Sequence, residues 1–183
     1  AAHRGTAYMV MADEDLTDLG GSIPQWTFQV QSCGAQRVIA LSPDGPDGTH
    51  QVMLTADGET FELKETPLNP NAELQGFLWH ALAYSPALNM ICACGEDSIM
   101  LSEDLGETWE LIDHGLGDEL GEMKGIAWSP SLELWAILRT HDTQGVLTSP
   151  DGRTWTLRDT PAVPAARAMH WAESAEIFVA GMS

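Results

Sequence analysis

Short apolar stretches alternate with polar turns along the chain, and the apolar stretches recur in a fixed order. Each repeat opens with an apolar strand that ends in Ser-Pro or a degenerate form of it, and in most repeats a second apolar strand follows. The first strands are residues 38–43, 81–86, 125–130 and 168–173, and the second strands are residues 90–94, 134–138 and 177–180. Short apolar runs bounded by turn residues predict β-strands. The pattern therefore predicts repeated pairs of short strands.

A polar loop sequence occurs three times along the chain, at residues 55–61, 102–109 and 149–155. Each copy reads hydroxyl, spacer, Asp, a turn Gly, spacer, Thr and a large aromatic. The Asp carboxylate is suited to accept hydrogen bonds from turn N–H groups, and Gly takes the positive-φ position. The residues that define the three loops are Thr55, Asp57, Gly58 and Phe61; Ser102, Asp104, Gly106 and Trp109; and Ser149, Asp151, Gly152 and Trp155. Each loop is predicted to be a hairpin held by its own side chains.

The repeats have a regular period. Aligning Leu41, Tyr84, Trp128 and Trp171 gives spacings of 43, 44 and 43 residues. Repeats of about 40–45 residues with several short strands each are typical of propeller blades. The sequence therefore predicts an all-β fold, a small β-propeller of about four blades.

The whole chain, residues 1–183, is interpreted as one propeller domain with blades near 36–66, 79–114 and 123–160. The last blade combines residues 166–183 with residues 5–30, so that N- and C-terminal strands close the ring without a free edge. In this interpretation residues 7–11 are a strand and residues 25–28 are a strand that carries the aromatic. The alternative is an incomplete ring that closes by association with another copy. The first repeat is short, which predicts three strands or a shortened inner pair.

The charge balance is strongly acidic, with 27 acidic residues against 8 basic ones and a net charge of −19. Such a surface repels nucleic acid and anionic membranes, so neither is expected as a partner. The chain has no apolar run long enough for a membrane helix and opens with no signal-peptide pattern. Because the acids are spread through every loop, a solubility role is favoured over docking to a basic partner or bridging by divalent cations.

The side chains that carry chemistry form no catalytic pattern. Cys33, Cys92 and Cys94 make no disulfide framework, and buried reduced thiols are favoured over a metal site. Among the histidines, His170 occupies a central-strand position and is interpreted as structural. Four tryptophans at repeat positions are assigned to packing between blades: Trp26, Trp109, Trp128 and Trp155. No catalytic, cofactor-binding or metal-binding residue is assigned, and no cofactor is expected.

The three loops resemble Asp-box (BNR-type) repeats, which occur in sialidase-like and other β-propellers. Residues 102–109 match the S-x-D-x-G-x-T-W form, and the other two loops match a form one residue shorter. The resemblance implies structural hairpins at the blade periphery, remote from any active site. Sialidase activity does not carry over, because the chain lacks the matching arginine cluster and the predicted ring is too small.

The tandem arrangement of these repeats also resembles virion proteins of tailed phages. It implies a non-enzymatic structural or decoration component of the tail, fibre or capsid surface, located in the virion and made in the host cytoplasm. Its expected partners are other virion proteins or copies of itself, with a surface glycan as a further partner. The alternative is a propeller module that binds a glycan or a peptide. An enzyme of unrecognised type is a more remote third hypothesis.

Overall fold

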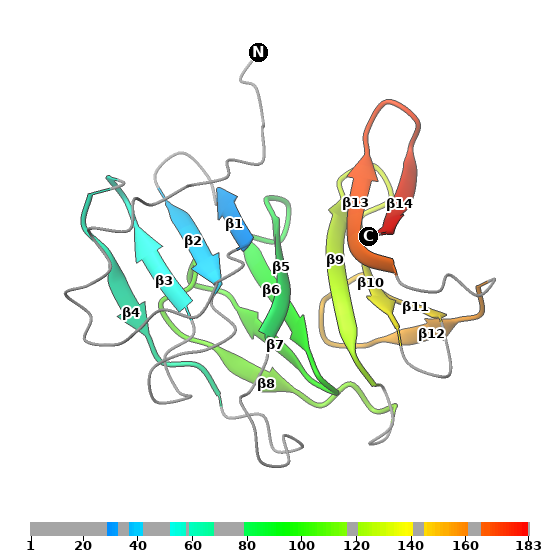
Figure 1. Ribbon diagram of the computed structural model, residues 1–183, viewed down its shortest axis with the longest axis horizontal. Helices are drawn as coiled ribbons and strands as arrows, with labels where there is room; N and C mark the ends of the chain where they lie inside the picture. The colour runs from blue at the N-terminus through cyan, green and yellow to red at the C-terminus, as the bar shows by residue number, and fades with distance from the viewer. Residues whose placement is uncertain are drawn as a thin grey trace.

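The computed structural model describes residues 29–32, 37–41, 52–57, 59–67, 79–116, 121–140, 145–160 and 166–182. The regular elements of these residues are strands, as Figure 1 shows. They are β1 (Gln29–Ser32), β2 (Val38–Leu41), β3 (Val52–Thr55), β4 (Glu62–Lys64), β5 (Trp79–Ser85), β6 (Met90–Gly95), β7 (Ile99–Ser102), β8 (Glu110–Ile112), β9 (Met123–Ser129), β10 (Leu134–Arg139), β11 (Gly145–Ser149), β12 (Thr156–Arg158), β13 (Ala166–Ala172) and β14 (Ile177–Met182). The expectation of an all-β fold is confirmed. In this part of the chain, no helix is long and apolar enough to cross a membrane.

The strands form three four-stranded antiparallel sheets, β1–β4, β5–β8 and β9–β12, and a two-stranded sheet, β13–β14. Within each sheet the strands pair in chain order, as expected for hairpin-connected meanders. The first strands of successive sheets lie side by side, β1 beside β5, β5 beside β9 and β9 beside β13. Figure 1 shows the sheets following one another in an arc around these first strands. We call β1, β5, β9 and β13 the inner strands.

The core lies between successive sheets, because alternate residues of a strand face opposite sides of its sheet. On the β5–β8 sheet, Cys92, Cys94 and Leu101 belong to a cluster shared with the β9–β12 sheet. Ile91 and Met100 belong to a second cluster shared with the β1–β4 sheet. All six residues of β6 are buried for this reason. The sheet is covered on both faces, which explains its continuous apolar strands.

The two described cysteines, Cys92 and Cys94, are buried and free, as the sequence predicted. Burial raises the pKa of both thiols well above their usual range. Trp128 and Trp155 are buried and Trp109 is half-buried, in keeping with packing roles. Trp128 also packs on Trp135, with ring centroids 4.9 Å apart. Cys33 and Trp26 lie outside the described residues.

The pairing of the first sheet corrects the alignment of its repeat. Val38 pairs with Thr55 on β3, just as Ile91 pairs with Ser102 and Trp135 with Ser149. The stretch at residues 38–41 is therefore a second strand, so the equivalence of Leu41 with Tyr84 is wrong. The first strand is β1, whose sequence Gln-Val-Gln-Ser has one apolar residue among four and therefore gives no clear strand signal. The first sheet thus has four strands rather than three, and its inner pair, β1 and β2, is shortened to four residues each, against seven and six in β5 and β6.

The predicted fourth blade is described in part. Strands β13 and β14 pair with each other, and residues 5–28 of the segment 5–30 that the sequence assigned to the same blade lie outside the described residues. Gln29 and Val30, from the end of that assigned segment, pair instead with Leu41 and Ala40 of the first sheet. The described strands therefore form an arc of sheets in which no pairing closes a ring.

The three Asp loops are hairpins at the ends of β3, β7 and β11, and we call them the Asp-turn hairpins. In the second, Asp104 Oδ1 accepts hydrogen bonds from Ser102 Oγ at 2.8 Å and from the Thr108 N–H at 2.9 Å. In the third, Asp151 Oδ1 accepts the corresponding bonds from Ser149 Oγ at 2.9 Å and from the Thr154 N–H at 2.7 Å. The carboxylate thus satisfies turn N–H groups that would otherwise need water.

The first Asp-turn hairpin repeats this arrangement. Asp57 Oδ1 accepts hydrogen bonds from Thr55 Oγ1 at 3.1 Å and from the N–H groups of Glu59 and Thr60 at 2.9 and 2.8 Å. Phe61 is half-buried at the position of the aromatic. Gly58 lies outside the described residues. In the other two hairpins the turn glycines have the expected positive φ, 91° at Gly106 and 74° at Gly152.

Each of the second and third Asp-turn hairpins also joins its sheet to the preceding one. A Cβ at Gly106 would come within 2.9 Å of Ile39 and Leu54 in the first sheet, and one at Gly152 within 3.1 Å of Leu101 in the second. Ion pairs cross the same boundaries. Lys64 Nζ lies 2.6 Å from Glu107 Oε2, and Arg153 Nη2 lies 2.9 Å from Glu103 Oε1. The hairpins are therefore packing elements between sheets as well as turns.

The carboxylates of the Asp-turn hairpins make stability depend on acid pH. Hydrogen bonds from the Thr60 and Glu59 N–H groups lower the pKa of Asp57 to about 2. At Asp104 and Asp151 burial raises the pKa, but hydrogen bonds from Thr108 and Thr154 outweigh it and the pKa is lowered. A carboxylate with a lowered folded pKa stabilises the fold fully above its unfolded pKa of about 4, and this stabilisation is lost as pH falls through the folded pKa.

We therefore expect the melting temperature to fall between about pH 4 and pH 2, and to fall less steeply in Asp57→Asn, which cannot titrate at this position. Thermal unfolding followed by circular dichroism across this pH range measures both slopes. Equal slopes in the wild type and the variant would contradict the role assigned to Asp57. Asp113→Asn is a control, since Asp113 accepts a local bond from the Gly115 N–H at 3.0 Å outside the three hairpins.

Candidate functional site

Three inner strands begin with a β-bulge at the same place. Trp79 pairs with Gly95 and Ala81 with Cys94, which leaves His80 as the extra residue of β5. On β9 the pairing jumps from Met123 to Gly125 and leaves out Lys124. On β13 it jumps from Ala166 to Ala168 and leaves out Arg167. A bulge inserts one unpaired residue and re-aims its side chain, and bulges are common next to functional sites.

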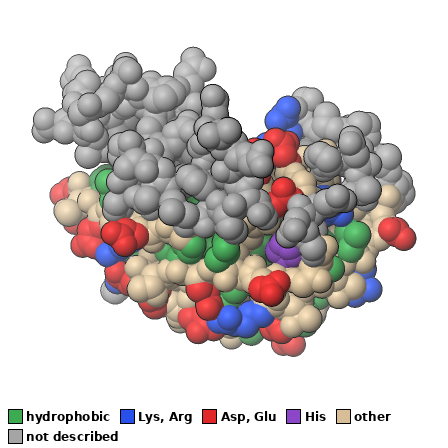
Figure 2. Space-filling view, turned by 90° about the horizontal axis from the view of Figure 1, so that it is seen from below, with side chains coloured by type: hydrophobic (Ala, Val, Ile, Leu, Met, Phe, Trp, Pro, Cys, Tyr) green, Lys and Arg blue, Asp and Glu red, His purple; other side chains and the backbone are tan. Residues whose placement is uncertain are grey.

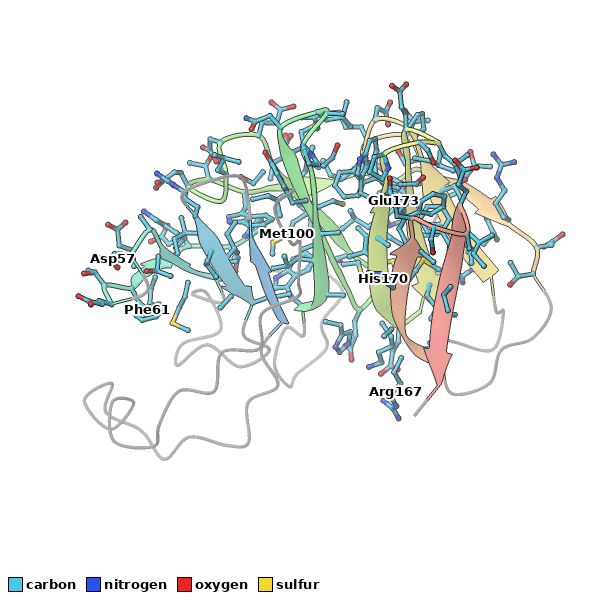
Figure 3. All side chains as sticks on the ribbon, turned by 90° about the horizontal axis from the view of Figure 1, so that it is seen from above. Asp57, Phe61, Met100, Arg167, His170 and Glu173 are labelled. Carbon is cyan, nitrogen blue, oxygen red and sulfur yellow. The ribbon has the colours of Figure 1, made fainter. Side chains whose placement is uncertain are left out.

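The three bulge residues are equivalent positions of the repeat. His80, Lys124 and Arg167 each stand four residues before the aromatic at Tyr84, Trp128 or Trp171. All three are nitrogen-bearing side chains, in a chain that has 8 Lys and Arg residues against 27 acids. Figure 3 shows Arg167 at the beginning of β13, with Glu173 beyond the far end of that strand. A nitrogen-bearing side chain therefore occupies the beginning of each of these three inner strands.

Two glutamates join His80 at this end of the molecule. Glu96 directly follows β6 and Glu122 directly precedes β9, and the two residues form an isolated antiparallel bridge. The potential ligand atoms of His80, Glu96 and Glu122 all lie within 4.8 Å of one another. With Lys124 these residues form a group that we call the bulge-end cluster.

Lys124 connects two members of the cluster. Its Nζ lies 3.2 Å from His80 Nε2 and 3.2 Å from Glu122 Oε2. Because an ammonium group can only donate, His80 Nε2 is the acceptor and the imidazole is neutral, with its proton on Nδ1. Burial and then the charge of Lys124 lower the pKa of His80 to about 4, against an opposing effect of Glu122. The neutral imidazole of His80 and the carboxylate of Glu122 thus both contact the ammonium group of Lys124.

Backbone bonds fix the segments that carry the glutamates. The Thr140 N–H donates to the carbonyl oxygen of Glu122 at 2.9 Å, and the Asp97 N–H donates to the carbonyl oxygen of Gly121 at 3.2 Å. The Gly121 N–H in turn donates to Asp97 Oδ1. Arg139 is 3% exposed at the end of β10; burial lowers the pKa of its guanidinium, and the charge of Asp97 opposes this shift. These hydrogen bonds hold the segment after β6 and the segment before β9 next to each other.

The residues singled out from the sequence do not belong to this cluster. The Asp-turn residues lie elsewhere, and Figure 3 shows Asp57 and Phe61 at the outer edge of the molecule, far from Arg167. His170, expected to be a structural residue of a central strand, is exposed on β13. Sequence analysis missed His80, Glu96, Glu122 and Lys124. One available signal was the recurrence of His80, Lys124 and Arg167 at a fixed distance before the repeat aromatic.

A second feature is a groove between the first two sheets, with a volume of about 660 Å³. Its lining combines Trp109, Pro67 and Leu111 with the carboxylates Glu107 and Glu110. Trp109 is held in place by a hydrogen bond from its Nε1 to the carbonyl oxygen of Gly106 at 3.1 Å. On the face shown in Figure 2, the acidic side chains are spread over the surface rather than gathered in one patch.

The described strands and the similar solved structures show an all-β, propeller-like fold. No family model matches the chain, and no curated protein matches it. Solved structures are similar in fold. A chain in the crystal structure of a nidogen/laminin complex has a TM-score of 0.61 and 12% identity, over 84% of this chain and 56% of that one. A GH74 enzyme of Niastella koreensis has a TM-score of 0.55 and 17% identity, over 79% of this chain and 19% of that one. This chain thus spans about half or less of either neighbour.

Proposed function

We propose that the chain is a non-enzymatic docking protein, a structural or decoration component of a tailed-phage virion. It acts through protein–protein contacts on the tail, fibre or capsid surface. The observation that supports this proposal most is the hydrogen-bond pattern of the three Asp-turn hairpins, which fits the Asp-box resemblance of their sequences. In this proposal the hairpins are structural and the side chains that they order serve packing between blades.

The proposal includes four blades, the last one built from residues 166–183 and 5–30. The described edge supports it, because Ile177 and Val179 of β14 are 53% and 43% exposed. Alternate residues share one face of a strand, so these two side chains form an apolar strip. A strip of this kind on the face of a sheet is best covered by a facing sheet, which ring closure or another copy would supply.

Mass spectrometry of purified particles of the source virus tests the virion assignment. We expect peptides of this chain in the particles at a constant ratio to the major structural proteins. Particles that lack the chain would refute the assignment. Native mass spectrometry of the purified chain at low and high salt then separates the two forms of closure. A monomer supports closure by the N-terminal segment, and a discrete oligomer supports closure between copies.

The groove beside Trp109 favours a second candidate function, the binding of a glycan or a peptide. An aromatic surface flanked by carboxylates offers stacking to a sugar ring and hydrogen bonds to its hydroxyl groups. Glycan and peptide arrays with the purified chain test this function. Leu111, 37% exposed in the groove, is changed to Asp to abolish binding, and Leu132, 54% exposed and outside its lining, is changed to Asp as the control. Binding that survives Leu111→Asp would exclude the groove.

A further inference from the structure

We propose that His80, Glu96 and Glu122 form a binding site for one divalent transition-metal ion, and that Lys124 is a built-in cation that competes with it. The proposal is independent of the virion and glycan hypotheses, because it rests on the bulge-end cluster. The ligands come from three segments, the bulge of β5, the residue after β6 and the residue before β9. One imidazole and two carboxylates fit zinc, and manganese as the next choice.

The geometry of the cluster is close to that of a metal site. Zinc binds nitrogen and oxygen ligands at about 2.0–2.2 Å, so ligand atoms around a tetrahedral ion are about 3.4 Å apart. The three ligand atoms of the cluster already lie within 4.8 Å of one another. Rotation of the glutamate side chains can supply the remaining approach, and the Glu122 side chain is 46% exposed. Three protein ligands leave one position open for water or a further ligand.

The position of Lys124 is a second, separate observation that marks a cation site. Its ammonium group lies 3.2 Å from both His80 Nε2 and Glu122 Oε2, where these two groups converge. A metal ion bound to the same two atoms must displace that ammonium. The four-carbon side chain of lysine has the rotational freedom to move it. Lys124 is therefore a competitor for the site, and its removal should strengthen binding.

Backbone hydrogen bonds and the β-bulge position the residues of the bulge-end cluster. The bridge between Glu96 and Glu122 sets the two carboxylates on adjacent segments of the chain. The Thr140 N–H and Oγ1 both donate to the carbonyl oxygen of Glu122, at 2.9 and 3.3 Å. The bulge in β5 leaves His80 unpaired and sets the direction of its side chain. The overall charge of −19 attracts any cation, but the imidazole ligand discriminates for zinc over calcium and magnesium, which prefer oxygen ligands.

Isothermal titration of the purified chain with ZnCl₂ tests the site, with native mass spectrometry for the stoichiometry. We expect one bound zinc ion. His80→Gln should weaken binding at least about tenfold, because even the loss of an outer-shell partner costs a metal site about ten- to a hundredfold in affinity. Lys124→Met should strengthen binding about tenfold, because it removes a like charge from the site. His170→Gln, which changes an exposed histidine outside the cluster, should leave the affinity unchanged.

Several results would overturn the proposal. Equal losses in His80→Gln and His170→Gln would assign the zinc to scattered surface histidines. Unchanged affinity in Lys124→Met would show that zinc binds elsewhere. A wild-type chain that binds zinc no more tightly than calcium would reduce the site to the general attraction of an acidic surface. If circular dichroism shows that His80→Gln is unfolded, Glu96→Gln replaces it, with the same weakening expected and with the absorption of bound Co²⁺ as a second readout.

Discussion

Gly125→Ala is expected to lower the free energy of unfolding by about 3 kcal/mol, the upper end of the usual cost of overpacking. A Cβ at Gly125 would lie 2.5 Å from the backbone nitrogen of Met169 and 2.8 Å from the carbonyl carbon of Ala168. Both atoms belong to the main chain of β13, so no side-chain rotation can relieve the contact. Either β9 and β13 separate, or the residues around the bulge shift.

Urea unfolding of the wild type and the variant measures this loss. Gly181→Ala is the matched control, because Gly181 is also a strand glycine of the same region and pairs with Ala168. A Cβ there would meet Ala168 Cβ at 3.9 Å, an ordinary contact. We expect Gly181→Ala to be neutral or stabilising by up to about 1 kcal/mol, since alanine has less backbone entropy to lose than glycine. Equal effects at the two positions would show that β9 and β13 are not in close contact.

Small residues follow the bulge in every inner strand where the structure shows one. Ala81, Gly125 and Ala168 come directly after His80, Lys124 and Arg167. The inner strands lie side by side, so a bulky side chain at this point would force them apart. The repeat therefore combines a polar bulge position with a packing position in two consecutive residues. This succession of a polar residue and a small one is the only trace of the bulge in the sequence of the inner strands.

Much of the fold was predictable because it follows from local rules. The period of two in β5 to β7 buries alternate residues on opposite faces, which the apolar stretches predicted. The Asp-turn hairpins were predictable because their hydrogen bonds join residues within five positions of each other. Strand β1 was missed because only one of its four residues is apolar. That omission shifted the alignment of the first repeat by one strand.

The bulge-end cluster was much harder to predict. A bulge is a property of the pairing between two strands, and the sequence of one strand does not show it. Glu96 and Glu122 are 26 positions apart in a chain with 27 acids, so nothing in their local sequence distinguishes them. They meet because the turn after β6 and the segment before β9 form a bridge. Only the three-dimensional arrangement brings an imidazole to the same point.

Gly106→Ala is expected to destabilise the protein by about 2 kcal/mol through two separate effects. The backbone of Gly106 has φ of 91°, a conformation that costs an L-residue about 1 kcal/mol or more. A Cβ would also lie 2.9 Å from Ile39 Cδ1 and from Leu54 Cδ2. These are the ends of flexible side chains, but Ile39 is fully buried and Leu54 nearly so, so their movement is limited. Overpacking of this kind adds about 1 kcal/mol or more.

Gly115→Ala separates the two effects, because Gly115 has φ of 69° and a Cβ there would meet nothing within 4 Å. Its loss in urea unfolding measures the backbone cost alone, and the excess loss at Gly106 measures the contact with the first sheet. If the excess is absent, the second Asp-turn hairpin is merely a turn. If it is present, the hairpin glycine is required for two reasons, the conformation of its own turn and the approach of the neighbouring sheet. The second reason also applies at the next boundary, because a Cβ at Gly152 of the third hairpin would lie 3.1 Å from Leu101 of the second sheet.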